Sequence, residues 1–477
     1  MFRFSRFLRP LYIAALGLAL SAGCGPRGEP VEPVSVEETG GPVAPVEIEG
    51  ASIALAPLDP AAPVVPTAEN GWPQFRGPNR NGVALGTNPP TEWRADKNVM
   101  WATDVPGRGN SSPVVDDGRI FLTTADEAAN TQSLLAYDLA TGDPLWQKQT
   151  AAGRLPKGGM HRESSHAATT PAVGGGAVFV TNLHDDAVWA SAWSVEGEKL
   201  WGEVKLGAFR PQFGYAASPV LYGSVVIVSA DNVGPGFLVA LDRESGDVRW
   251  RTPRDAQISF NTPLLATLNG RDTLIVAGND KLDAYDPTDG SLMWSVPGLT
   301  ATVSGSAVAG VVDVGGESRS IVIASGGYPG SETLAVFPPA AGETEPTVAW
   351  RDEGKAYVPS PLLVDGLAFV THDDGRTWCF DAATGEIAWR TRLSKPQFRP
   401  SAVAVGTGDD LRVLQPSTPG ITTVYRVTSR GFEKLAENQL GDECYASPAV
   451  IGDTLLIRSA SGYGANRQDR LYRIAAD

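Results

Sequence analysis

The stretch LLAYDLATGDPLW, residues 134–146, decides the fold because nearly the same phrase returns three times. The returns are LVALDRESGDVRW at 238–250, LDAYDPTDGSLMW at 282–294 and TWCFDAATGEIAW at 377–389. In each copy a glycine follows the aspartate by four residues, and a tryptophan follows the glycine by four. Glycine supplies the positive φ of a tight turn, and aspartate accepts hydrogen bonds from backbone N–H groups within it. Each copy therefore predicts two strands joined by a tight turn, with a tryptophan near the start of the second strand.

A second repeated element marks where each unit begins. It is a serine or threonine followed by proline or alanine and then aliphatic residues, and a glycine-containing turn and a β-rich run come after it. The eight starts are Ser112, Thr170, Ser218, Thr262, Ser306, Ser360, Ser401 and Ser447. Four short strands in each unit of roughly 40 to 60 residues are typical of β-propeller blades. The sequence thus predicts an all-β fold, a single eight-bladed β-propeller of four-stranded antiparallel blades.

The recurring tryptophans are predicted to dock one blade on the next. A large flat side chain at the same place in successive blades can fill the wedge between them and bury on the order of 150–250 Å². The seventh unit, around RGFEKLAENQL at 430–440, lacks this residue. We assign the docking role to Trp101, Trp146, Trp201, Trp250, Trp294, Trp350 and Trp389.

The two ends of the repeat region are complementary. The eighth unit stops after its third strand, whereas KNVMWATDV at 97–105 is a strand that belongs to no preceding unit. We therefore predict that residues 97–105 supply the outer strand of the last blade, which removes an open sheet edge.

The N-terminus carries a targeting segment. Residues 1–23 combine three arginines, an apolar run and small residues before Cys24, and they resemble a bacterial lipoprotein signal. The resemblance implies that Cys24 is lipidated, and Gly25 after it implies an outer-membrane destination; a plain secretory signal is the alternative. Residues 24–70, rich in proline and glutamate and free of aromatics, are predicted to form a disordered tether. Residues 71–477 are predicted to form the propeller.

Composition excludes several functional classes. A formal net charge of −15 argues against a nucleic-acid partner. The three cysteines, Cys24, Cys379 and Cys444, have no C-x-x-C spacing and are too few for a disulfide scaffold. We expect Cys379 and Cys444 to be free, packed thiols.

The pattern A-x-D-x-x-T-G-x-x-x-W at 136–146 resembles the tryptophan-docking repeat of pyrroloquinoline-quinone-type (PQQ-type) propellers. The resemblance runs from about Trp72 to the end, and WPQFRGPNRNG at 72–82 is similar to the start of many secreted PQQ-like proteins. It implies either a quinoprotein dehydrogenase or a cofactor-free BamB-like protein. The adjacent cysteine pair typical of the enzymes is missing, and their calcium ligands and base cannot be matched. We therefore assign no catalytic residue and no metal ligand.

Strand order places the candidate binding residues on one face of the propeller. If the first strand of each blade runs from face X to face Y, the inter-blade connections lie on face X and the glycine turns lie on face Y. Three interpretations stay open for the polar residues of face X: solvated loop residues, a metal site, or a binding patch for a peptide, glycan or small molecule. The candidates are His161, Arg162, His166, His184, Arg210, Tyr215, Tyr357, His372, Asp373, Arg399 and Tyr445.

These observations predict a monomeric, envelope-anchored propeller that acts as a non-catalytic platform for an envelope protein or peptide, as BamB-like proteins do. It would be held through lipidated Cys24, facing the periplasm from the outer membrane, and would need no cofactor. The alternative is a PQQ-dependent oxidoreductase, which would require PQQ and calcium.

Overall fold

The computed structural model describes residues 71–158, 160–210, 212–254, 258–354, 356–393 and 397–476. The predicted signal segment, the lipidation site Cys24 and the tether lie outside these residues. Within the described residues, 33 strands form eight sheets, and two short 3-10 turns, η1 (Gly408–Asp410) and η2 (Gly464–Asn466), are the only helical elements. No helix in this part of the chain is long and apolar enough to span a bilayer.

The first four blades follow one another along the chain, each with its strands in sequence order. Blade 1 comprises β3 (Val114–Asp116), β4 (Arg119–Asp126), β5 (Thr131–Asp138) and β6 (Pro144–Ala152); blade 2 comprises β7 (Ala172–Gly174), β8 (Ala177–His184), β9 (Ala187–Ser194) and β10 (Lys199–Ala208); blade 3 comprises β11 (Val220–Tyr222), β12 (Val225–Ala230), β13 (Gly236–Asp242) and β14 (Val248–Arg254); blade 4 comprises β15 (Leu264–Leu268), β16 (Arg271–Gly278), β17 (Lys281–Tyr285) and β18 (Leu292–Pro297).

The remaining blades repeat this order. Blade 5 comprises β19 (Val308–Val314), β20 (Glu317–Gly326), β21 (Glu332–Phe337) and β22 (Thr347–Asp352); blade 6 comprises β23 (Leu362–Val364), β24 (Leu367–Thr371), β25 (Arg376–Asp381) and β26 (Ile387–Arg392); blade 7 comprises β27 (Val403–Gly406), β28 (Arg412–Pro416), β29 (Ile421–Thr428) and β30 (Gly431–Gln439); blade 8 begins with β31 (Ala449–Ile451), β32 (Thr454–Ser461) and β33 (Gln468–Ile474). The prediction of an eight-bladed propeller with four-stranded antiparallel blades is confirmed.

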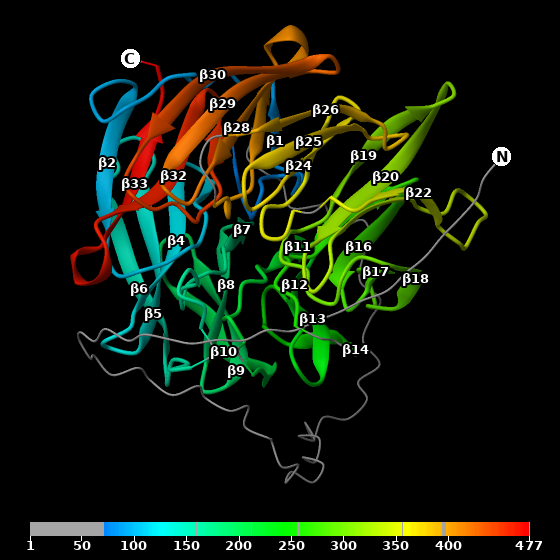
Figure 1. Cartoon of the computed structure of the whole chain (residues 1–477). Coiled ribbons are helices and arrows are strands. Elements are labelled where there is room, and N and C mark those ends of the chain that lie inside the picture. The colour runs from blue at the N-terminus through cyan, green and yellow to red at the C-terminus, as the bar shows by residue number, and fades with distance from the viewer. Residues whose placement is uncertain are drawn as a thin grey trace, which may run out of the picture. The chain divides into compact units, whose positions relative to one another are not determined.

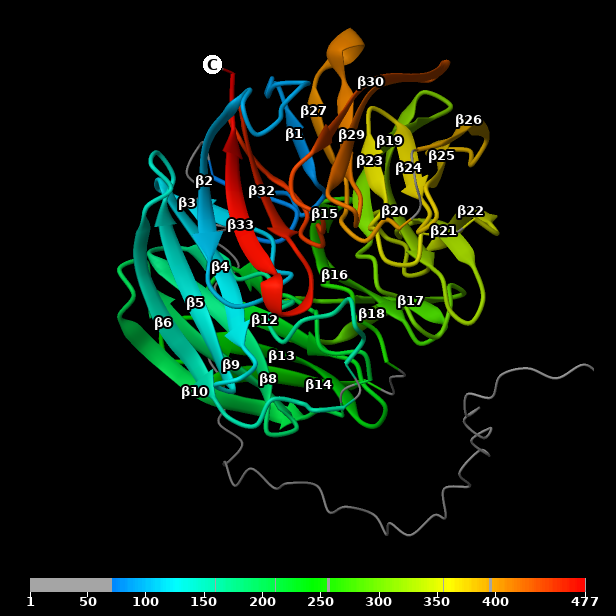
Figure 2. The same ribbon diagram turned by 60° about the vertical axis from the view of Figure 1, so that its left-hand side comes forward.

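The last blade is completed by the beginning of the described chain, as predicted. β2 (Val99–Val105) pairs antiparallel with β33, from Val99 opposite Ile474 to Val105 opposite Asp469. Figures 1 and 2 show β2 beside the C-terminal strand from two directions. A strand that was not predicted, β1 (Val83–Leu85), pairs in parallel with β27 and extends blade 7 to five strands.

The docking tryptophans explain the glycine of the repeated phrase. The Trp101 indole N–H donates to the Leu139 carbonyl of the next blade at 3.2 Å, and Trp146 donates to Val195 in the same way. A Cβ atom on Gly142 would lie 2.6 Å from the Trp101 ring, and the φ of Gly142 is +77°. Equivalent bonds join Trp201 to Arg243, Trp250 to Pro287, Trp350 to Ala382 and Trp389 to Thr428. In blades 1, 2, 3, 4 and 6 the turn therefore needs glycine both for its backbone conformation and to receive the tryptophan of the preceding blade.

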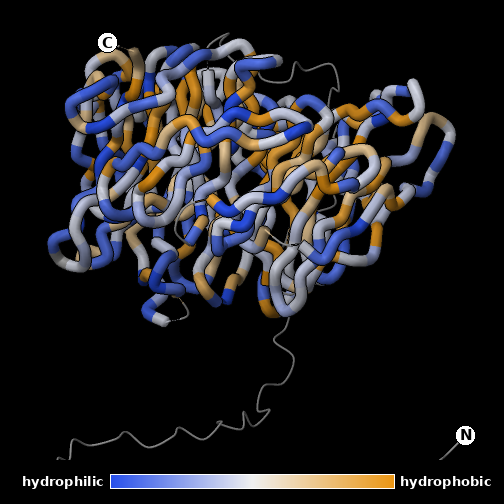
Figure 3. The backbone as a smooth tube through the Cα atoms, turned by 45° about the horizontal axis from the view of Figure 1, so that its top comes forward, coloured by the Kyte–Doolittle hydropathy of each residue, from blue (hydrophilic) through white to orange (hydrophobic). Residues whose placement is uncertain are grey.

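Hydrophobic side chains gather between neighbouring blades. Trp350 of blade 5 stacks on Phe380 of blade 6 with ring centroids 5.1 Å apart. Trp294, the docking residue of blade 4, is buried in the cluster that joins blades 4 and 5. In blade 7, Ala436 stands opposite Val424 next to the strand irregularity, where Trp146 stands opposite Ala136 in blade 1. Figure 3 shows hydrophobic residues along the strands and mainly hydrophilic residues in the connecting loops.

Candidate functional site

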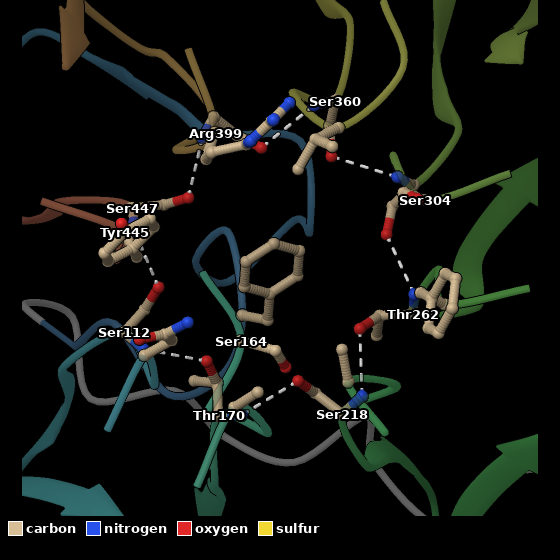
Figure 4. Close-up of a pocket in the computed structure, with 18 of the residues that line it drawn as sticks. Ser112, Ser164, Thr170, Ser218, Thr262, Ser304, Ser360, Arg399, Tyr445 and Ser447 are labelled. Atoms are coloured by element: carbon tan, nitrogen blue, oxygen red, sulfur yellow. Dashed lines mark hydrogen bonds between the residues drawn. The ribbon is translucent and has the colours of Figure 1, made fainter. Parts of the chain in front are cut away.

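The eight predicted blade starts form a closed ring around the propeller axis. The backbone N–H of each start donates to the side-chain hydroxyl of the start in the next blade, at 2.9 to 3.1 Å, and Ser447 of blade 8 donates to Ser112 of blade 1. We call these residues the hydroxyl ring: Ser112, Thr170, Ser218, Thr262, Ser306, Ser360, Ser401 and Ser447. Figure 4 shows the members that it labels around a common centre. The serine or threonine of each start is thus required for ring closure.

Residues 72–82, which we call the plug, cross the channel on the face Y side of the hydroxyl ring. Trp72 exchanges backbone hydrogen bonds with Val115, three residues beyond Ser112 along the inner strand of blade 1. Val173 of blade 2 donates to Pro73. Two arginines of the plug donate to carbonyls of other inner strands, Arg80 to Leu221 at 2.8 Å and Arg76 to Pro361 at 2.6 Å. The plug therefore contacts at least four inner strands and closes this end of the channel.

A cavity of about 370 Å³ lies between the plug and face X. The hydroxyl ring lines it, together with a second ring formed by the residue two positions before each start. We call this the variable ring: Asn110, Ala168, Ala216, Phe260, Ser304, Val358, Arg399 and Tyr445. In an extended segment, residues i and i−2 point to the same side, so both rings face the axis. The wall is completed by Phe75 of the plug and by His161, Glu163, Ser164, Phe213 and Tyr357 of the face X connections.

The cavity holds one charged cluster. The Arg399 Nε donates to Glu163 Oε2 at 2.8 Å, and its NH1 group donates to Asp373 Oδ2. Burial lowers the pKa of Arg399, but the Asp373 and Glu163 carboxylates outweigh this effect and hold that pKa above its ordinary value. Arg399 is therefore a cation bonded to two carboxylates.

Four of the predicted site residues line this cavity: His161, Tyr357, Arg399 and Tyr445. Asp373 lies behind Arg399 and also accepts a hydrogen bond from the Val358 backbone N–H at 3.2 Å. The structure thus brings four of the eleven predicted residues together at one cavity, and their role in binding stays a prediction.

The other predicted residues lie elsewhere. His184 is buried, stacks on Trp189 at 4.9 Å and faces Asp185 at 3.1 Å. His372 is buried against Trp378. Arg162 is exposed and His166 half-buried; both border a neighbouring hollow.

Two predicted residues of the connection between blades 2 and 3 also lie away from the cavity. Tyr215 is buried and donates its hydroxyl to the Ser229 carbonyl at 3.0 Å, whereas Arg210 is exposed. Tyr215 stands three residues before Ser218, and Ala216 stands two before it and lines the cavity. Tyr215 points into the core, whereas Tyr357, which stands three residues before Ser360, lines the cavity. The position three residues before a start therefore does not by itself place a side chain in the cavity.

Phe75, Glu163, Phe213 and Phe260 were not among the predicted site residues. Phe260 could have been found by counting two residues back from Thr262, a rule that identifies the whole variable ring. No local signal identifies Phe75, which reaches the cavity from the plug, or Glu163, whose partner Arg399 is 236 residues away. Among the described residues, no three histidine, cysteine or acidic side chains are grouped closely enough to hold a metal ion.

The two described cysteines are free and buried, as predicted. Burial raises the pKa of each thiol to about 12. The reactive thiolate is therefore scarce at neutral pH, and access is blocked as well. We expect Ellman's reagent at pH 8 to leave native residues 71–477 unlabelled and to modify both thiols in urea. Rapid labelling of the native protein would contradict this.

The family model described as outer membrane protein assembly factor BamB matches residues 91–170 and 164–391. No curated protein matches the chain. The solved structure of BamB from Moraxella catarrhalis aligns with a TM-score of 0.53 at 15% identity and covers 79% of this chain and 98% of that one.

Quinohemoprotein alcohol dehydrogenases share the architecture as well. The enzyme from Comamonas testosteroni aligns with a TM-score of 0.60 at 13% identity, over 85% of this chain and 80% of that one. The quinohemoprotein alcohol dehydrogenase ADHIIG from Pseudomonas putida HK5 aligns with a TM-score of 0.58 at 12% identity, over 87% of this chain and 83% of that one. These identities show a shared fold alone. Because the family model matches more than half of the sequence, the chain belongs to the BamB family of PQQ-like β-propellers.

Proposed function

We propose that face X is a non-catalytic docking platform, and that its axial cavity receives part of a partner protein or peptide of the cell envelope. The cavity carries this proposal, because it combines a repeating ring that closes the fold with a variable ring of different side chains. Pockets with apolar walls and a few fixed polar groups are typical binding sites. The charged wall residues, Arg399 and Glu163, are bonded to each other, which favours fixed recognition over proton transfer.

The quinoprotein alternative requires a site for PQQ, an anion with three carboxylates. The charged cluster at the wall opposes such a ligand, because one arginine already serves two carboxylates, Glu163 and Asp373. A further anion would meet net negative charge in a partly buried site. This charge balance supports the cofactor-free alternative.

The proposed location is the periplasmic side of the outer membrane, with attachment through lipidated Cys24. Membership of the BamB family and the signal-like segment support it.

Capture from envelope extracts tests the platform. Residues 71–477 serve as bait, beside Phe213→Ala and Tyr445→Ala in the cavity wall and Leu292→Ala as a control. Leu292 is exposed at the start of β18, next to a glycine turn of face Y. We expect a partner that the parent and the control retain and both cavity variants lose. If the cavity variants capture the same proteins as the parent, the proposal is refuted. Dye-linked alcohol oxidation after addition of PQQ and calcium would refute it as well.

A further inference from the structure

We infer that the axial cavity binds an organic ammonium group, carried either by a small amine or by a lysine side chain of a docked partner. The inference rests on the proposed function, because it specifies which chemistry the platform recognises. Four features of the cavity support it: aromatic walls, a strained aromatic residue at the mouth, a wall cluster of two carboxylates and one guanidinium, and the hydroxyl ring.

Aromatic rings supply much of the wall. Phe75, Phe213, Phe260, Tyr357 and Tyr445 all line the cavity. The Phe213 and Phe260 rings meet edge to face, with centroids 6.5 Å apart and an interplanar angle of 67°. The negative face of an aromatic ring attracts a cation, and the attraction is stronger where the cation is desolvated. Rings at steep angles can surround a compact cation such as an ammonium group.

Phe213 is held in an unfavourable backbone conformation. Its φ is +70°, a left-handed value that is rare for a bulky residue. Its side chain is nevertheless 53% exposed, so burial of the ring does not explain the strain. The backbone of Phe213 bridges to Met160, and its ring meets the His161 ring at 6.2 Å. Strain of this kind is concentrated at binding sites, and here it places an exposed phenyl ring in the cavity wall.

The charge balance favours a cation. The cluster contains two carboxylates, Glu163 and Asp373, and one guanidinium, Arg399. A further cation, Arg162, lies 3.8 Å from Glu163, but its side chain is 81% exposed and water screens it. Burial raises the pKa of Tyr445, and Glu163 adds to this rise, whereas Arg108, Arg399 and Arg162 oppose it.

The hydroxyl ring can also bind an ammonium group. Each hydroxyl oxygen has two acceptor positions and accepts one hydrogen bond within the ring. The second position is available to an N–H donor in the cavity. A primary ammonium group can thus combine ring faces, hydroxyl oxygens and a nearby carboxylate.

Calorimetric titration of residues 71–477 tests the inference. The probes are choline against its uncharged isostere 3,3-dimethylbutanol, and a lysine peptide against the same peptide with acetyl-lysine. We expect each cation to bind at least about fivefold more tightly than its neutral counterpart. Binding of choline without the lysine peptide would identify a small amine as the ligand; the reverse would identify a partner side chain.

Two variants and a control locate the binding. Glu163→Gln keeps an acceptor for Arg399 but removes one negative charge, and Phe213→Leu removes one ring. Each substitution should lower the affinity for the cationic probes about five- to tenfold and should leave the affinity for the neutral probes nearly unchanged. Glu196→Gln, an exposed acid on the face Y turn of blade 2, should change nothing. Melting curves verify that each variant is folded.

Equal affinity for the charged and neutral probes would overturn the inference, as would an unchanged choline affinity in Glu163→Gln. If no ammonium binds while envelope partners still depend on Phe213 and Tyr445, the ammonium inference fails and the docking platform stands. If no ammonium binds and partner capture does not depend on Phe213 and Tyr445, both the ammonium inference and the docking platform fail.

Discussion

A chain that lacks residues 71–105 is expected to lose cooperative unfolding. The deletion removes β2 and leaves β33 of blade 8 as an open edge. It also removes two buried tryptophans, Trp72 and Trp93, from the cluster that joins blades 7, 8 and 1. Loss of a buried tryptophan costs about 3–5 kcal/mol, and the whole stability of a protein is typically about 5–15 kcal/mol. The combined loss should leave no sharp transition.

Scanning calorimetry and circular dichroism measure this outcome. The matched control lacks residues 24–70 and keeps the propeller, so it should melt like the parent. A chain without residues 71–105 that melts as sharply and at the same temperature as the parent would show that closure by β2 is dispensable.

Arg254→Met is expected to destabilise the propeller by about 3–5 kcal/mol. Arg254 bonds Asp231 at 2.7 Å and Asp283 at 3.1 Å, between blades 3 and 4. The side chains of all three residues are at most 5% exposed. Removal of the guanidinium would leave two carboxylates in a buried site, and within the described ranges one cation, Lys281, 3.4 Å from Asp283, remains paired with them. Uncompensated buried charge is the reason for the large effect.

Urea unfolding of three variants separates this effect from the loss of an ordinary ion pair. Arg426→Met breaks the exposed pair with Glu433 and should cost less than about 1 kcal/mol. Adding Asp231→Asn to Arg254→Met removes one of the stranded charges and should restore part of the stability. If Arg254→Met costs no more than Arg426→Met, the buried network is not important for stability.

The fold could be predicted because each blade repeats its own contacts. The Trp101 ring packs against Gly142, and the Trp146 ring packs against Gly197 in the turn of the next blade. The spacing of glycine and tryptophan within one blade therefore indicates how that blade packs on its neighbours. The eight starts were predictable for the same reason, since each one bonds to the next. The parallel strand β1 has no counterpart in the other described blades, so no repeated sequence pattern predicts it. The boundaries of the signal segment and tether stay predictions.

Part of the candidate site could be predicted from the repeat, and His161 and Tyr357 were predicted from the connections on face X. Arg399 and Tyr445 stand two residues before their starts and line the cavity. His184 and His372 were candidates because histidine can bind ligands and metals, but each side chain is buried against a tryptophan. Glu163 lies in the connection between blades 1 and 2, whereas Arg399 lies between blades 6 and 7. The spacing of residues within a blade therefore does not predict this ion pair.

The division between the two axial rings has a consequence for evolution and engineering. The hydroxyl ring joins the blades through backbone donors and small side chains, whereas the side chain two positions earlier takes no part in those eight bonds. Recognition can therefore be rewritten one blade at a time without disturbing closure. The eight positions form a circular array whose substitution leaves the eight ring bonds in place, and a library of substitutions there should yield many folded receptors with different ligands.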